Sequence, residues 1–233
     1  MTAPVAPSAV GTGGRPRLRV ATTNPGKRDE LFRILRTALG PAAAVLDMRD
    51  LGDLPGFVPA AEDAPTYREN VVRKALAARL ADPGCAVLAD DSGIEVDALG
   101  GGPGVRSARW ATDPRGAGLS GAGLNAALLA RLGGLPPERR AARMVAWVAL
   151  LLPDGCRVAA GSVAGRVAQA ARGSGGFGYD AVFVLPDGRR LSEVQPAEKD
   201  MVSHRGQAVG GVVADLRRWL GLPAAAAVTG AQP

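Results

Sequence analysis

The chain has 233 residues, of which 47% are hydrophobic and 21% charged, so it can bury a core as one domain or as two closely packed lobes. Its longest apolar runs, 145–152 and 224–228, fall well short of the roughly 20 residues that a membrane helix needs. Residues 1–15 lack the charged start and apolar segment of a secretory signal. We expect a cytoplasmic globular protein without a membrane partner, with one two-lobed domain at 17–221 and loose tails at 1–16 and 222–233.

The chain is basic, with a formal net charge of +6 that comes mostly from arginine. A polyanionic small molecule and a nucleic acid are both compatible with this charge. Aromatic residues make up only 4% of the chain and do not alternate with basic segments, as a platform for stacking single strands requires. We therefore expect no stable nucleic-acid partner. The two cysteines, Cys85 and Cys156, form no Cys-x-x-Cys pair and are expected to be free thiols.

The first half of the chain predicts strands and helices in alternation. A short strand at 18–21 is followed by a loop and by a helix with apolar residues at 31, 34, 35, 38 and 39. A second helix is expected from residue 65 or 66 to just before Pro83, with Val72, Leu76 and Leu80 along one face. A strand at 86–89 then leads into a turn at 90–93, and a further strand is expected at 94–99.

The second half predicts an antiparallel part of the sheet. Residues 119–132 are expected to be helical, and strands at 142–152 and 157–169 are joined by the hairpin-like turn Pro153-Asp154-Gly155. A glycine-rich loop at 173–178 precedes a short strand at 181–185. The last helix is expected to begin around Ser203 and to end at Gly221. The pattern as a whole indicates a mixed α/β fold.

The most informative stretch is 90–110, which begins with two adjacent aspartates. Neighbouring carboxylates repel each other unless a cation or hydrogen-bond donors compensate them. Consecutive residues on a strand point to opposite faces, so only one of Asp90 and Asp91 should face a metal ion. Together with Glu62 they are hard oxygen ligands of the kind that Mg²⁺ prefers beside substrate phosphates. Capping of a turn around Ser92 and Gly93 is the alternative explanation.

The segment Thr22-Thr23-Asn24-Pro25-Gly26-Lys27 lies between a predicted strand end and a helix start. Backbone N–H groups and the helix dipole favour a bound anion at such a position, and Lys27 adds a positive charge. The segment lacks the spacing of a Walker A loop, because Arg28 follows the lysine. An ordinary N-cap turn is the alternative.

The glycine-rich loop Gly173-Ser174-Gly175-Gly176-Phe177-Gly178 matches Gly-x-Gly-x-x-Gly. A strand-like run follows it instead of a helix, so the dinucleotide-binding interpretation fails on context. Such a loop, with Phe177, Tyr179 and Asp180, can approach a flat ligand closely while an aromatic ring stacks on it. A simple flexible connection remains possible.

A basic group stands at the start of the last predicted helix. His204, the only histidine of the chain, and Arg205 lie in its first turn, and Lys199 precedes them. These side chains can converge on one acidic or keto-bearing ligand, although a solvated basic turn is the alternative. With a single histidine and no cysteine near another metal ligand, the chain cannot build a multi-histidine zinc site.

Taken together, segments 22–27, 90–93, 104–109, 175–180 and 203–208 resemble the Ham1-like inosine triphosphate pyrophosphatase family in order and spacing over residues 17–221. The resemblance implies an elongated mixed β-sheet with flanking helices, two lobes around a substrate cleft, and a homodimer. It also implies an Mg²⁺-dependent enzyme that cleaves dITP, ITP and XTP between the α- and β-phosphates, releasing the monophosphate and pyrophosphate. Removal of deaminated purine nucleotides from the nucleotide pool is the implied purpose.

The resemblance further implies a role for each matching residue. Asp91 would hold the metal ion and accept the proton of the attacking water, and Glu62 would be a second metal ligand. The residues that would bind the nucleoside triphosphate are Thr22, Thr23, Asn24, Pro25, Gly26, Lys27, Ser92, Phe177, Gly178, Tyr179, Asp180, Lys199, His204 and Arg205. The chain departs from the family pattern at Thr23 and around Glu62. A Maf-like pyrophosphatase for pyrimidine or modified nucleotides and a basic nucleic-acid-binding protein are the alternatives.

Overall fold

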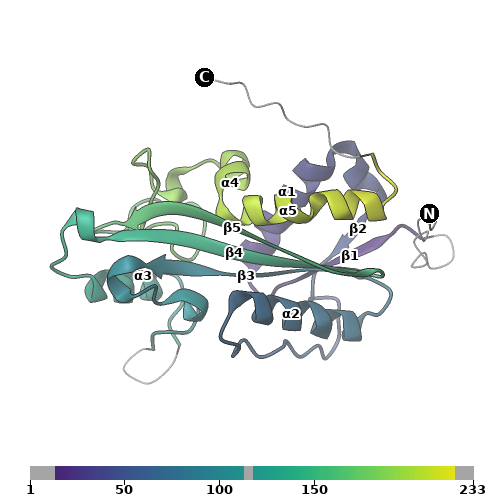
Figure 1. Cartoon of the computed structure of the whole chain (residues 1–233), viewed down its shortest axis with the longest axis horizontal. Coiled ribbons are helices and arrows are strands. Elements are labelled where there is room, and N and C mark those ends of the chain that lie inside the picture. Colours follow the sequence, from purple (N-terminus) through teal and green to yellow (C-terminus); the bar gives the residue numbers. More distant parts are fainter. Residues whose placement is uncertain (1–13, 113–117, 224–233) are drawn as a thin grey trace.

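The computed structural model describes residues 14–112 and 118–223. Residues 1–13 and 224–233, which make up most of the two predicted tails, lie outside the described part. A single six-stranded sheet with strand order β2-β1-β3-β4-β5-β6 forms the centre of the elongated molecule, with helices on both faces (Figure 1). The predicted mixed α/β fold with flanking helices is confirmed.

One half of the sheet is parallel. Strand β1 (Arg17–Ala21) pairs in parallel with β2 (Asp47–Arg49) on one side and with β3 (Ala86–Val96) on the other. Parallel neighbours need crossover connections, and helices α1 (Pro25–Leu39) and α2 (Tyr67–Ala81) supply them. The end of β1 lies beside the middle of β3, where Ala21 pairs with Ala89, and this brings residues 22–27 close to Asp90 and Asp91.

The other half is antiparallel. Strands β4 (Ala141–Leu152) and β5 (Gly155–Val167) form the predicted long hairpin, and β4 also pairs with β3 over its length. The short strand β6 (Phe183–Val184) pairs with the end of β5 and is shorter than the strand predicted at 181–185. Helix α3 (Ala122–Arg131) lies within the predicted helical region and packs its leucines into the cluster around Phe183.

The helices divide between the two faces of the sheet (Figure 1). Helices α1, α4 (Pro196–Val202) and α5 (His204–Trp219) lie on one face, and α2 lies on the other. Apolar side chains of α1 and α5, such as Leu35 and Leu216, pack against the strands in one continuous core cluster. None of the described helices is long and apolar enough to cross a bilayer.

Two predictions about local structure are wrong. Strand β3 runs without a break through Asp90, Asp91, Ser92 and Gly93, where a turn was expected. Helix α2 turns the opposite stripe inward: its buried residues are Tyr67, Asn70, Val71, Ala75 and Ala78. Leu76 and Leu80 are instead 48% and 82% exposed. The inward stripe combines polar Asn70 with small residues such as Ala75 and Ala78, so hydrophobicity alone selected the wrong face.

Candidate active site

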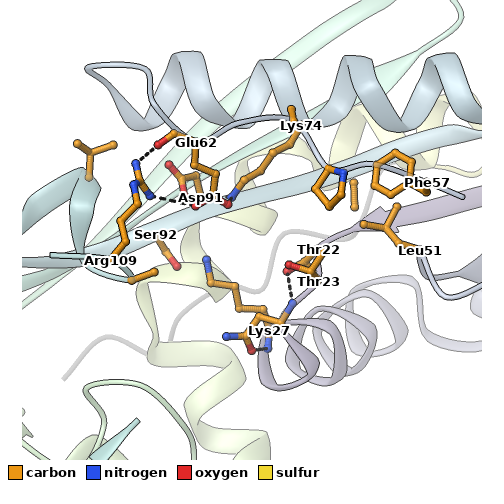
Figure 2. Close-up of a pocket in the computed structure, with 16 residues that line it drawn as sticks. Thr22, Thr23, Lys27, Leu51, Phe57, Glu62, Lys74, Asp91, Ser92 and Arg109 are labelled. Carbon is orange, nitrogen blue, oxygen red and sulfur yellow. Dashed lines mark hydrogen bonds and ion pairs between the residues drawn. The ribbon is translucent and has the colours of Figure 1, made fainter. Parts of the chain in front are cut away.

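The predicted anion-binding loop has the expected position at the end of β1 and the start of α1. Asn24 is the N-cap of α1, and its side chain accepts a hydrogen bond of 3.1 Å from the backbone N–H of Lys27. The backbone N–H of Asn24 in turn donates to Thr22 Oγ1 at 3.2 Å. Thr22, Thr23, Asn24 and Lys27 line a cavity of about 200 Å³ (Figure 2). A helix N-terminus with a lysine beside it favours an anion in this cavity.

The opposite wall of the cavity carries the carboxylates of Glu62 and Asp91 (Figure 2). The ammonium group of Lys74, from α2, lies between them: Nζ is 3.2 Å from Asp91 Oδ1 and also forms an ion pair with Glu62. Arg109 donates to Glu62 Oε2 at 3.1 Å and to the Glu62 carbonyl oxygen. The cavity is therefore lined by two carboxylates and three cationic side chains, the third being Lys27.

Sequence reasoning gave no role to Lys74 or Arg109. A signal for Lys74 was present, because it stands three residues after Val71 and four before Ala78, both of which are buried. A lysine on the sheet-facing stripe of a helix needs a buried anionic partner. Arg109 had no comparable signal, since its partner lies 47 positions away in a loop.

The two carboxylates of the cavity differ in proton affinity. Burial raises the pKa of Asp91, and the nearby negative charges of Glu62 and Asp90 add to this, so the pKa stays above its ordinary value despite Lys74 and Lys27. Burial also raises the pKa of Glu62, but the charge of Lys74 and its hydrogen bond outweigh burial and lower the pKa overall. Asp91 is thus the better proton acceptor of the pair.

The residues present fit a divalent metal ion. Asp91 Oδ2 is buried and has no hydrogen-bond partner among the described residues, and Glu62 offers a second hard oxygen donor across the same cavity. Within 14–112 and 118–223, no group of three or more histidine, cysteine or acidic side chains could hold a metal ion alone. An ion held by two carboxylates and completed by substrate phosphates matches the usual binding mode of Mg²⁺.

Asp90 points to the other face of the sheet, as the alternation along a strand predicts. Its Oδ1 is 2.8 Å from Lys27 Nζ and its Oδ2 is 3.1 Å from Arg205 Nε. Burial raises the pKa of Asp90, but the charges of Arg205 and Lys27 outweigh burial and hold the pKa well below its usual range. Arg205 also donates to Ser92 Oγ at 2.8 Å and pairs with Glu30 at 3.1 Å.

A second group of predicted site residues lies beside this cavity and does not line it. Lys199 Nζ is 2.6 Å from Asp180 Oδ2 and 3.2 Å from Glu30 Oε2. The ring of Phe177 lies 4.9 Å from Lys199 Nζ and 5.4 Å from the guanidinium carbon of Arg205. The ring also contacts Gly26, where an added Cβ would be 2.5 Å from Phe177 Cδ1. Phe177 thus packs between the anion-binding loop and the two buried cations.

Tyr179, Gly178 and His204 are also placed outside the cavity. Tyr179 donates from its hydroxyl to the Ser107 carbonyl at 2.6 Å and accepts a hydrogen bond of 2.8 Å from Trp110 Nε1. Gly178 has φ of 59°, and it follows Phe177 in the loop. His204 is buried, and within the part of the chain that the structure describes neither of its ring nitrogens has a hydrogen-bond partner. Burial, with the charge of Arg205, lowers the pKa of His204 to about 3, so the imidazole is neutral.

The structure therefore brings together the anion-binding loop, Glu62, Asp91 and Ser92 in one cavity, and packs Phe177, Asp180, Lys199 and Arg205 in a cluster behind it. These features define an α/β protein with a site suited to a phosphorylated ligand and a divalent cation. Comparison with known protein families identifies the family to which the chain belongs. Residues 18–214 match the model of the Ham1 family, and the chain belongs to this family.

Individual relatives cover most of the chain. A protein of Symbiobacterium thermophilum named dITP/XTP pyrophosphatase is 44% identical over 194 residues, which is 83% of this chain and 91% of that protein. The solved structure of a dITP/XTP pyrophosphatase from Mycobacterium abscessus is 39% identical and covers 84% of this chain and 98% of its own, with a TM-score of 0.63. The Ham1 protein of Staphylococcus aureus is 30% identical, covers 87% and 98%, and has a TM-score of 0.70.

Proposed function

We propose that the protein hydrolyses deaminated purine nucleoside triphosphates, dITP, ITP and XTP, to the monophosphate and pyrophosphate, and so removes them from the nucleotide pool. The observation that carries this proposal is the cavity in which an anion-binding loop faces Asp91 and Glu62, in a chain whose relatives are named dITP/XTP pyrophosphatase. Neither a Maf-like enzyme for pyrimidine nucleotides nor a nucleic-acid-binding protein is favoured by these comparisons.

The proposed cofactor is Mg²⁺, held by Asp91 and Glu62. When bound, the ion would neutralise phosphate charge and polarise the phosphorus–oxygen bonds. The loop of residues 22–27 would hold the triphosphate through its backbone N–H groups and through Lys27. Lys74 and Arg109 supply further positive charge on the opposite wall of the cavity. These cations would stabilise the charge that develops on the leaving pyrophosphate.

Asp91 is the proposed proton acceptor. With no ion bound, its raised pKa makes it a better base than an ordinary carboxylate, and its Oδ2 has no hydrogen-bond partner among the described residues. A water molecule that gives its proton to Asp91 attacks the α-phosphorus in line with the bridging oxygen between the α- and β-phosphates. The phosphorus–oxygen bond to that oxygen breaks, and pyrophosphate leaves with the bond's electron pair.

The base would be recognised by the cluster behind the cavity. Donors from Lys199, Arg205 or neutral His204 can bond the 6-keto oxygen of hypoxanthine or xanthine, whereas the 6-amino group of adenine is itself a donor and would be left unpaired. Phe177 would stack on the base once its ring moves off Gly26. Tyr179 and Gly178 would hold the loop that carries this ring.

We further propose that the protein is a cytoplasmic homodimer. The two cysteines are free, Cys85 buried and Cys156 exposed, which suits a reducing compartment. Leu76 and Leu80 form an exposed apolar stripe on the outer side of α2, a surface that association would bury. Sedimentation of the wild-type protein at the mass of a monomer would contradict the dimer.

Measurement of pyrophosphate release from dITP in the presence of Mg²⁺ tests the proposed function. Pyrophosphate and monophosphate should form in equal amounts, and the Asp91→Asn variant should lose this activity by about 10²–10⁴-fold, the range for removal of a general base. dGTP is the substrate control. Release of single phosphate, or equal rates with both nucleotides, would contradict the proposed substrate and reaction.

A further inference from the structure

Asp90 is a buried carboxylate that has no role in the chemistry proposed above. It is 0% exposed and lies on the face of β3 opposite to Asp91. Its two oxygens are divided between two cations: Oδ1 is 2.8 Å from Lys27 Nζ, and Oδ2 is 3.1 Å from Arg205 Nε. One carboxylate is therefore shared by a lysine of the anion-binding loop and an arginine of α5.

The two cations belong to different parts of the site. Lys27 lines the cavity, and its side chain is 15% exposed. Arg205 is 2% exposed and lies under the ring of Phe177. Glu30 pairs with Arg205 and also with Lys199, so charges of alternating sign connect the cavity to the cluster around Phe177. Two members of this series contact residues that line the cavity: Asp90 contacts Lys27, and Arg205 contacts Ser92.

Burial makes these contacts strong and sensitive to one another. Charges that are shielded from solvent interact with little screening by salt. Loss of the contact between Asp90 and Lys27 therefore changes the strength of the contact between Asp90 and Arg205. A polyphosphate in the cavity competes with Asp90 for Lys27. When Lys27 turns toward phosphate, the negative charge of Asp90 is left to Arg205, and this holds the guanidinium more firmly against Asp90 and Ser92.

We propose that Asp90 is a positioning residue that couples the phosphate site to the nucleobase site by orienting both Lys27 and Arg205. The proposal rests on the proposed function, because Arg205 belongs to the group that would read the base. The coupling is reciprocal, as linkage requires: occupancy of the cavity improves the fit of the base, and the correct base improves the hold on the phosphates. Discrimination between bases thus depends on a carboxylate that touches neither end of the substrate.

The Asp90→Asn variant tests the coupling through steady-state release of pyrophosphate from dITP and dATP. The amide keeps the shape of the side chain but carries no charge to hold the two cations. KM for dITP should rise about tenfold with a much smaller change in kcat, and the preference for dITP over dATP in kcat/KM should fall about tenfold. Asp90→Glu, which keeps the charge, should retain more of this preference.

Asp82→Asn is the matched control. Asp82 is also buried and also pairs with an arginine, Arg19, at 2.6 Å, but neither Arg19 nor its other cationic partner, Arg17, lines the cavity. Its loss should lower the melting temperature and leave the preference for dITP unchanged. The coupling is refuted if Asp90→Asn slows dITP and dATP by the same factor.

Failure of the Asp90→Asn variant to fold and failure of the proposed function can each be distinguished from failure of the coupling. If Asp90→Asn does not fold, Asp90→Glu carries the test, because displacement of the carboxylate by one methylene should still weaken the preference. An unchanged preference in Asp90→Glu would then overturn the coupling. If the wild-type protein releases pyrophosphate from neither nucleotide, the proposed function itself fails, and the role of Asp90 fails with it.

Discussion

Replacement of Lys74 by methionine tests the arrangement of the two cavity carboxylates. The ammonium group of Lys74 lies between Asp91 and Glu62, and its side chain is 14% exposed. Methionine has a similar length and no charge, so the change leaves two facing carboxylates without the cation between them. A divalent ion that binds the same oxygens has to displace this ammonium group in the wild-type protein and meets no such competitor in the variant.

The cost follows from the burial of the pair. Breaking an ion pair of this kind by removing one partner costs about 3 kcal/mol, at the lower end of the range for fully buried pairs. For a domain of roughly 150–250 residues each kcal/mol corresponds to about 2–4 °C, so the melting temperature should fall by about 6–12 °C. Mg²⁺ should recover much of this loss, because a bound ligand stabilises the native state in proportion to its affinity.

The assay is thermal unfolding followed by intrinsic fluorescence, with EDTA or with Mg²⁺ and without nucleotide. The rise in melting temperature on addition of Mg²⁺ should be larger for Lys74→Met than for the wild type. Arg73→Met is the control on the same helix, since Arg73 pairs with Asp63 at the surface, where both side chains are more than half exposed. That pair contributes at most about 1 kcal/mol. An equal response to Mg²⁺ in Lys74→Met and the wild type would refute the reasoning.

Four other predictions concern burial and packing. Asp91→Asn should melt no lower than the wild type although it loses activity, because a carboxylate with a raised pKa destabilises the native state while it is ionised; a marked fall in its melting temperature would contradict this. His204 has a pKa of about 3 when folded, against about 6.5 when unfolded, so its stabilising contribution is complete above pH 6.5 and is lost as the pH falls toward 3. Urea titrations at several pH values between 6.5 and 5 give the free energy of unfolding as a function of pH. This free energy should fall less steeply with decreasing pH in His204→Gln than in the wild type, by up to about 1.4 kcal/mol per pH unit, and equal pH dependence in the two proteins would contradict the burial of a neutral imidazole. Gly161→Ala should lower stability by about 2–3 kcal/mol, because the new Cβ would lie 2.7 Å from the backbone nitrogen of Ala208 in α5. Gly210→Ala, which meets nothing within 4 Å, should raise stability by about 1 kcal/mol through helix propensity, and chemical denaturation of the pair measures both.

The elements that the sequence predicts well are those whose signals are local. Asn24 caps α1 and Ser203 caps α5, and of the apolar residues expected on α1, Leu31, Ile34, Leu35 and Leu39 are buried and Ala38 is partly buried. The hairpin of β4 and β5 follows from two apolar runs around a Pro-Asp-Gly turn. In each case the residues that decide the structure are neighbours in the chain. Helix α4 and strand β2 lack such a signal: both are short, and their places depend on packing against α1, α5 and β1.

The candidate site could be predicted in its residue types but not in its geometry. Asp90 and Asp91 look like a turn because carboxylates in the middle of a strand are unfavourable when only their neighbours are considered. The strand continues because Lys27 and Arg205 compensate Asp90 on one face and Lys74 compensates Asp91 on the other, and these cations come from three different helices. Successive side chains of β3 point to opposite faces of the sheet, so the neighbouring residues Asp90 and Asp91 place their carboxylates on different faces. A turn at this point would have placed both charges in solvent and left Lys74 and Arg205 buried without anionic partners on β3.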